Sequence, residues 1–287
     1  MFWWVFAILA GMTYCVQLEM NKGFKLSGMH LNTVRALFAT VLMVPLIPLM
    51  EWPTLPAYYL VTIVGAAISV VCMVAQYNLA AQKNGRVACL YQPINIVLTF
   101  LFWLMIDAGQ RQFLMDNPLK ALGIGSAFIL FVTSIQFTRK NDAGWQALLA
   151  VVPIAVLYSI LSVISKLALE EGISMLAISL SFVFLSNIFM FLMSMPILYS
   201  KRIVKLIPSR KIFFGAAWIA FFHTLAWVLV CIAYILTPNP AYVTVLVGLA
   251  PIWFYIYYRT RRIPDDASPV AGIFMMSASF VVLLFSR

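Results

Sequence analysis

Residues 211–236 read KIFFGAAWIAFFHTLAWVLVCIAYIL, and after Lys211 this run carries His223 as its only strongly titratable side chain near mid-depth. A membrane-crossing helix needs about 20 apolar residues, so the run can cross a bilayer once. Comparable runs recur along the chain between stretches of Pro, Gly and charge. We expect ten spans; nine is the alternative, because two links are only about one tight turn long. The expected spans are 2–18, 29–50, 57–81, 86–106, 118–137, 145–169, 173–199, 211–236, 239–258 and 269–286.

The composition of the whole chain agrees with this pattern. Of 287 residues, 64% are hydrophobic and 10% are charged, and the mean hydropathy is +0.99. A soluble domain has roughly a quarter of its residues charged, and one core of this size could not bury so much apolar surface. We therefore expect an all-α integral membrane protein whose surroundings are the lipid bilayer. Nucleic acid is not an expected partner, because the basic residues lie in short connections between apolar runs.

Sequence features recur in the same order in the two halves of the chain, which indicates an internal repeat. Gly-Ala-Ala begins at Gly65 and again at Gly215. The other recurring features are Tyr14, Lys22 and Gly28, matched at the same intervals by Tyr158, Lys166 and Gly172, and the internal prolines Pro93 and Pro251. Each half holds five spans, an odd number, so the second half must enter the membrane from the opposite face. The expected inverted repeats are residues 1–138 and 145–287, joined by the connection 139–144.

The features that carry a family resemblance are the span-ending lysines Lys22 and Lys166, Arg35, and the runs NPAYVTVLVGLAPI at 239–252 and SPVAGIF at 268–274. In these features the sequence resembles the drug/metabolite transporter superfamily, specifically its EamA-like ten-span type. The resemblance covers nearly the whole chain. It implies two five-helix bundles around a central cavity and the transport of small organic metabolites. The chain departs from the family pattern before its last span, where Arg259, Arg261 and Arg262 stand in a connection that often holds a glutamate.

Lysines and arginines are unevenly distributed between the two sets of connections. About 14 of them follow the odd-numbered spans and about four lie on the other side. Basic residues in short connections mark the cytoplasmic side. We therefore expect both termini outside the cytoplasm, in a bacterial cytoplasmic (inner) membrane.

Polar side chains deep in apolar spans are the candidate site residues, because they are costly in a bilayer and tend to face a cavity or the bundle interior. His223 and Trp227 lie one helical turn apart and could line a site in which the histidine binds or relays a proton. The alternative is a neutral histidine hydrogen-bonded to a neighbouring helix. The remaining polar candidates in the first, third, fourth and sixth spans are Tyr14, Gln17, Tyr77, Tyr91, Gln92, Asn95, Tyr158 and Ser162. Pro93 should kink the fourth span.

Arg35 lies about two turns into the second span and is the last candidate. A guanidinium at that depth is a natural partner for a carboxylate or a phosphate. The alternative is that its side chain reaches back to the cytoplasmic interface and pairs with Glu19.

The favoured function is secondary transport of a small polar or amphipathic solute, such as an amino-acid-like metabolite, by alternating access. All nine acidic residues lie at span ends or in connections, so no mid-membrane carboxylate is available for proton coupling. No cofactor, metal site or catalytic residue is expected, and a monomer would suffice, although the sequence does not define the oligomeric state. The alternatives are a flippase for a lipid carrier and a membrane-embedded lipid-modifying enzyme, which would need clustered His, Asp or Glu.

Overall fold

The computed structural model describes residues 2–82, 87–89, 91–142, 145–169, 174–200, 209–262 and 269–286, and over these ranges it contains helices and no strands. The expected all-α class is therefore confirmed for this part of the chain. In chain order the α-helices and the two 3-10 helices (η) are α1 Trp3–Phe24, α2 Gly28–Met43, η1 Val44–Leu49, α3 Pro56–Gln82, η2 Val87–Cys89, α4 Gln92–Ile106, α5 Ala108–Asp116, α6 Pro118–Asp142, α7 Trp145–Ala168, α8 Met175–Ser200, α9 Arg210–Leu236, α10 Pro240–Val247, α11 Ala250–Thr260 and α12 Pro269–Phe285.

Seven helical segments in the described ranges are long and apolar enough to cross a membrane. They are α1, α2 with η1, α3, α7, α8, α9, and α10 with α11. Helices α4 and α5 pass the same test together but are bent by 101° at Asp107, so they form either a broken span or a re-entrant loop. These helices fit a multi-pass integral membrane protein.

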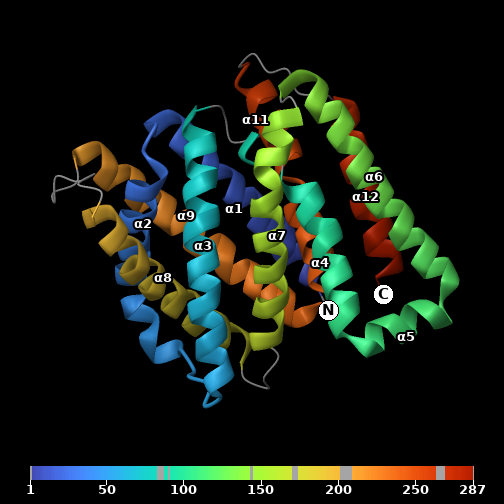
Figure 1. Ribbon diagram of the computed structural model, residues 1–287, viewed down its shortest axis with the longest axis horizontal. Coiled ribbons are helices and arrows are strands. Elements are labelled where there is room, and N and C mark those ends of the chain that lie inside the picture. Colours follow the sequence, from blue (N-terminus) through green and yellow to red (C-terminus); the bar gives the residue numbers. More distant parts are fainter. Residues whose placement is uncertain are drawn as a thin grey trace.

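Helix α5 was not expected from the sequence. It begins after Asp107, whose side chain caps it by accepting a hydrogen bond from the backbone N–H of Gln110 at 3.0 Å. An aspartate at this position satisfies one of the amides that the first turn leaves without a partner. The link between the fourth and fifth spans is therefore itself helical, and it runs across one end of α4 and α6 (Figure 1).

The two spans that contain Pro93 and Pro251 are interrupted just before these prolines. The expectation that Pro93 bends a continuous helix is wrong, because α4 begins at Gln92 and Pro93 lies in its first turn. Pro251 likewise lies in the first turn of α11, after the break at Gly248. Proline is favoured there because first-turn amides have no partner within the helix. Gly248 at the second break packs closely on α4, since an added β-carbon there would lie 3.0 Å from Ile96 Cδ1.

The helices pack so that both halves of the chain share one interior (Figure 1). Helix α1 contacts α9, and α3 contacts α7 and α8. Helix α2 contacts α8 and α9 at one end of the molecule, and α6 pairs with α12 at the other. Helices α4 and α10 contact each other between these two groups. Segments that are far apart in the sequence therefore surround the middle of the bundle.

Asn21 fixes the end of α1 to α3, and its removal should destabilise the fold. Its fully buried amide donates to the carbonyl of Tyr77 at 2.8 Å and accepts from the N–H of Leu26 at 3.2 Å. Asn21→Ala removes the acceptor of the buried backbone N–H of Leu26 and leaves that group unpaired, so we expect a loss of about 1–3 kcal/mol of stability. A lower midpoint of thermal unfolding in detergent would show it. Gln112→Ala, which removes only exposed bonds to Asp116 within α5, is the control and should change the midpoint little. Equal effects would contradict this role.

Candidate functional site

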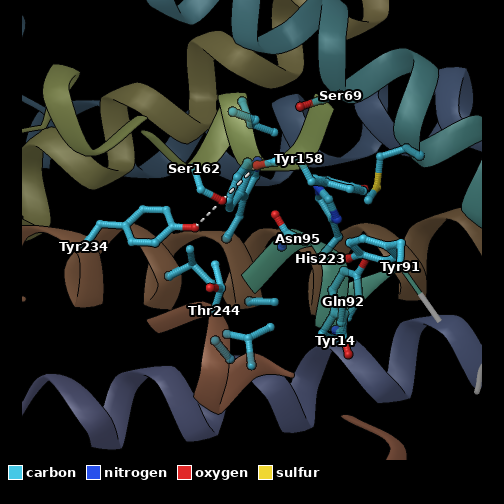
Figure 2. Close-up of a pocket in the computed structure, with 17 residues that line it drawn as sticks. Tyr14, Ser69, Tyr91, Gln92, Asn95, Tyr158, Ser162, His223, Tyr234 and Thr244 are labelled. Carbon is cyan, nitrogen blue, oxygen red and sulfur yellow. Dashed lines mark hydrogen bonds between the residues drawn. The ribbon is translucent and has the colours of Figure 1, made fainter. Parts of the chain in front are cut away.

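A cavity of about 80 Å³ lies at the centre of the bundle, between α1, α3, α4, α7, α9 and α10 (Figure 2). A cavity measured in this way needs roughly 10–15 Å³ for each water molecule, so the space suits a compact solute. Eight of the eleven residues expected from the sequence line it, namely Tyr14, Tyr91, Gln92, Asn95, Tyr158, Ser162, His223 and Trp227. Gln17, Arg35 and Tyr77 do not line it.

An amide from α3 joins two of the lining tyrosines, and a third tyrosine packs against both of them. Gln76 Oε1 accepts hydrogen bonds from Tyr14 Oη and, at 2.8 Å, from Tyr158 Oη. The hydroxyls of Tyr14 and Tyr91 lie 3.4 Å apart, and the rings of Tyr91 and Tyr158 are stacked with centroids 4.8 Å apart. Gln76 itself is fully buried. Side chains from α1, α7 and the start of α4 thus form one aromatic cluster, in which a single amide oxygen binds two of the three hydroxyl groups.

His223 is held in orientation by the first helix. Its Nδ1 donates to Gln17 Oε1 at 3.1 Å, and Gln17 is fully buried between α1 and α9. A neutral imidazole that donates from Nδ1 keeps its lone pair on Nε2. His223 Nε2 is buried and has no hydrogen-bond partner in the described part of the chain. The alternative interpretation of His223 was a hydrogen bond to a neighbouring helix, and that bond is present. The same side chain also borders the cavity.

The remaining lining residues differ in how fully they are bonded. Tyr234 Oη donates to Ser162 Oγ at 2.9 Å, and Ser162 in turn donates to the carbonyl of Tyr158 (Figure 2). Asn95 Oδ1 accepts from the hydroxyls of Thr99 and Ser159. Gln92 is different: it is only 3% exposed, and neither atom of its amide has a partner among the described residues. Polar atoms buried in this way are costly unless a ligand or water pairs with them.

Arg35 is fully buried between α2 and α8, outside the cavity. It donates from Nη1 to Asn187 Oδ1 at 3.2 Å and from Nη2 to Asn32 Oδ1 at 2.9 Å. The expected alternative, in which Arg35 reaches the interface and pairs with Glu19, is wrong, because Glu19 pairs with Lys22 at 3.2 Å and accepts from Tyr258 Oη. No carboxylate of the described residues lies within ion-pair distance of this guanidinium.

Tyr77 lies outside the cavity, in contrast to the expectation from the sequence. Tyr77 is fully buried, its hydroxyl has no partner among the described residues, and it lies outside the cavity lining. Asn21, which continues the polar face of Tyr14 and Gln17, bonds to α3 as described above. The three polar residues of the first span therefore have different roles: Tyr14 lines the cavity, Gln17 binds His223, and Asn21 binds α3.

Some contributors were not selected as site residues from the sequence. Ser69 and Thr244 line the cavity, and Asn32 and Asn187 bind Arg35. Two signals could have identified the asparagines: Asn32 precedes Arg35 by one helical turn, and Asn187 is the only amide side chain in the apolar run 173–199. Among the described residues, no three His, Cys, Asp or Glu side chains are placed to hold a metal ion.

Comparison with known proteins gives a likeness of fold. No family model matches the chain, and no curated protein matches it. A solved structure described only as "Crystal structure of protein" superposes with a TM-score of 0.67 over 98% of this chain and 97% of that one, at 14% sequence identity. At this identity the likeness concerns the fold alone. Because the superposition covers nearly all of both chains, the whole helical arrangement is shared with that structure.

Proposed function

We propose that the chain is a secondary transporter that moves a small polar or amphipathic organic metabolite by alternating access, as an EamA-like member of the drug/metabolite transporter superfamily. The observation that carries the proposal is a central cavity lined from both halves of the chain, by Tyr14 and Gln92 from the first half and Tyr158 and His223 from the second. Concave sites with an apolar lining and a few polar groups are typical of small-molecule binding.

The packing of the helices supports the proposed inverted repeat of ten spans. We pair α1 with α7, α2 with α8, α3 with α9, α4 with α10 and α11, and α6 with α12. When each helix is replaced by its partner in the other repeat, the contact between α1 and α9 becomes the contact between α7 and α3, which is also present. In the same way, the contact between α2 and α9 becomes the observed contact between α8 and α3. The contacts α2 with α8, α4 with α10, and α6 with α12 convert into themselves. A contact pattern that is unchanged by this exchange is expected of two units related by a twofold axis.

The broken helices lie at corresponding places in the two proposed repeats. One break precedes Gln92 and Pro93, and the other precedes Ala250 and Pro251. Many secondary transporters build their binding site where interrupted helices meet near the bilayer midplane. In this chain, Tyr91 and Gln92 at the first break, and Thr244 and Val247 just before the second, line the cavity.

The proposal includes an orientation and a membrane. Most of the basic residues fall in the connections after the odd-numbered spans, so we assign those connections to the cytoplasm and both termini to the outside. The composition and length suit a bacterial inner-membrane carrier that functions as a monomer.

A flippase for a lipid carrier is the second candidate, and one observation favours it. An apolar groove of about 630 Å³ runs between α1 and α11, lined by Leu9, Met12, Val16, Trp253 and Tyr257 among others. A groove on this outer surface could hold a lipid tail. The central cavity is much smaller, which favours a compact solute as the cargo.

The transport test compares two tyrosines. Tyr158 lines the cavity, whereas Tyr199 is 76% exposed on α8. We expect purified protein in proteoliposomes to take up at least one solute from a panel of small metabolites, and Tyr158→Ala to slow this uptake by roughly tenfold or more, because it removes the stacked ring and the bond to Gln76. Tyr199→Ala is the control and should leave uptake near the wild-type rate.

Two further measurements define the outcome. Tyr158→Phe keeps the stacked ring and removes only the hydroxyl, so its uptake rate should lie between those of the wild type and Tyr158→Ala. A graded loss of this kind is expected of a binding-site residue and not of a misfolded protein. Scrambling of a fluorescent lipid in the same vesicles measures the second candidate. If no solute moves while lipid is scrambled, the flippase is the better assignment; equal uptake by the two alanine variants would remove the cavity from the mechanism.

A further inference from the structure

Two side chains of the cavity lining carry buried polar atoms that have no partner among the described residues. Gln92 Oε1, Gln92 Nε2 and His223 Nε2 are all buried, and none has a hydrogen-bond partner within the described ranges. Both side chains belong to the cavity lining, as Figure 2 shows. Unpaired buried polar atoms are costly, so a solute that pairs with all three would bind in preference to one that pairs with fewer.

The hydrogen-bonding roles of these atoms define what such a solute must offer. The Gln92 amide provides one carbonyl acceptor and one NH₂ donor. His223 donates from Nδ1 to Gln17, so its Nε2 is an acceptor. The site therefore presents two acceptors and one donor group, and it requires a solute that donates at least twice and accepts once.

A carboxylate does not meet this requirement. An ionised carboxyl group only accepts, so it would leave Gln92 Oε1 and His223 Nε2 unpaired. Arg35 does not compensate, because it lies outside the lining and its two Nη atoms are already bonded to Asn187 and Asn32. A primary carboxamide meets the requirement, since its carbonyl can accept from Gln92 Nε2 and its two N–H groups can donate to Gln92 Oε1 and His223 Nε2.

We propose that this cavity recognises a compact, uncharged solute through a planar primary-amide edge that pairs with Gln92 and His223. The inference rests on the proposed transport function and specifies its substrate class. The stacked rings of Tyr91 and Tyr158 and the indole of Trp227 border the same cavity and favour a flat group beside the amide. The cavity of about 80 Å³ limits the solute to a small molecule of this kind.

The test uses three probes that share one benzoyl group, applied to the purified full-length protein. Benzamide carries the complete amide edge, benzoate replaces it by acceptors alone, and N,N-dimethylbenzamide keeps only the carbonyl. A ligand that binds the folded protein raises its apparent thermal stability, so a titration of the unfolding midpoint reports affinity. We expect benzamide to act at roughly tenfold to hundredfold lower concentration than either analogue, the range that one or two unpaired buried polar groups impose.

Two glutamine variants locate the preference. Gln92→Met keeps the length of the side chain and removes its polar atoms, so benzamide should lose its advantage over benzoate. Gln110→Met is the matched control: Gln110 is also buried, but it lies on α5 outside the cavity and donates to Tyr242 Oη, so the preference should persist. The probe series on the wild-type protein stands even if a variant folds poorly.

The outcomes separate this inference from the transport proposal. Binding of benzoate as tightly as benzamide, no shift with benzamide, or an unchanged preference in a folded Gln92→Met protein would overturn the amide assignment. If the proteoliposome panel nevertheless contains a transported solute, the transport proposal stands without it. If benzamide binds as expected and no solute moves, the cavity is a binding site for amides and the transport proposal fails.

Discussion

Gly28→Ala is expected to destabilise the protein strongly, although it adds a single methyl group. Gly28 opens α2 where this helix meets α3, and its N–H donates to Asn78 Oδ1 at 2.7 Å. A β-carbon at this position would overlap the backbone oxygen of Val74 and lie 2.8 Å from Asn78 Oδ1. Because one of these atoms belongs to the main chain of α3, the two helices would have to separate. Overpacking of this kind costs about 1–3 kcal/mol and occasionally more.

The control for this prediction is Gly23→Ala, which also lies near the connection between α1 and α2. A β-carbon at Gly23, inside α1, would meet no atom within 4 Å. Alanine is favoured over glycine in a helix by up to about 1 kcal/mol, so this variant should unfold at the same temperature as the wild type or slightly higher. The measurement is the midpoint of thermal unfolding of both variants in one detergent. Similar midpoints for the two would show that α2 and α3 are less closely packed at Gly28 than the structure indicates.

The apolar spans could be predicted from the sequence because their length alone carries the signal. The run 211–236 corresponds to α9 at Arg210–Leu236, and the run 57–81 to α3 at Pro56–Gln82. Helix α5 could not be found in this way, since Asp107, Arg111 and Asp116 interrupt any apolar run there. It forms because Asp107 caps it and because it packs against α4 and α6, and neither effect contributes to hydropathy.

The prolines show a second limit of the sequence. A proline inside an apolar run is compatible with a kinked helix and with a new helix start, because both relieve the missing amide. At Pro93 and Pro251 the chain takes the second solution. At the second break the chain also packs closely, because Gly248 lies against Ile96 of α4, 152 residues away in sequence, where an added β-carbon would come within 3.0 Å of Cδ1.

The candidate site was predictable where a polar residue stood out from apolar neighbours. Tyr158, His223 and Gln92 were found for this reason, and all line the cavity. Their companions Gln17 and Tyr77 satisfy the same criterion but face other helices. A span that is apolar on every side carries no periodic signal to show which face is turned inward, so this choice depends on neighbours that the sequence does not identify.

Asn187→Leu is expected to be the most damaging change at the interface of α2 and α8. It removes the acceptor from Arg35 Nη1 while the guanidinium remains fully buried, with its Nε already lacking a partner among the described residues. Loss of a hydrogen bond to a buried charged group costs roughly 1.5–3 kcal/mol. The control is Asn117→Leu, which removes a half-buried amide that bonds only to the carbonyl of Phe113 and should have a smaller effect.

Combining Asn187→Leu with Arg35→Met should recover much of this loss, because the double variant removes the charge together with its partner. Apolar side chains of similar volume often replace buried charged groups without loss of stability. The unfolding midpoints of the wild type, the two single variants and the double variant form a cycle that measures the coupling between the two sites. We expect the double variant to be more stable than Asn187→Leu alone, and strict additivity of the two losses would contradict this view of Arg35.

Uptake by the stable double variant then separates the role of Arg35 in the fold from its role in transport. A folded double variant with slow uptake would mean that the buried cation is needed for transport as well as for the packing of α2 against α8.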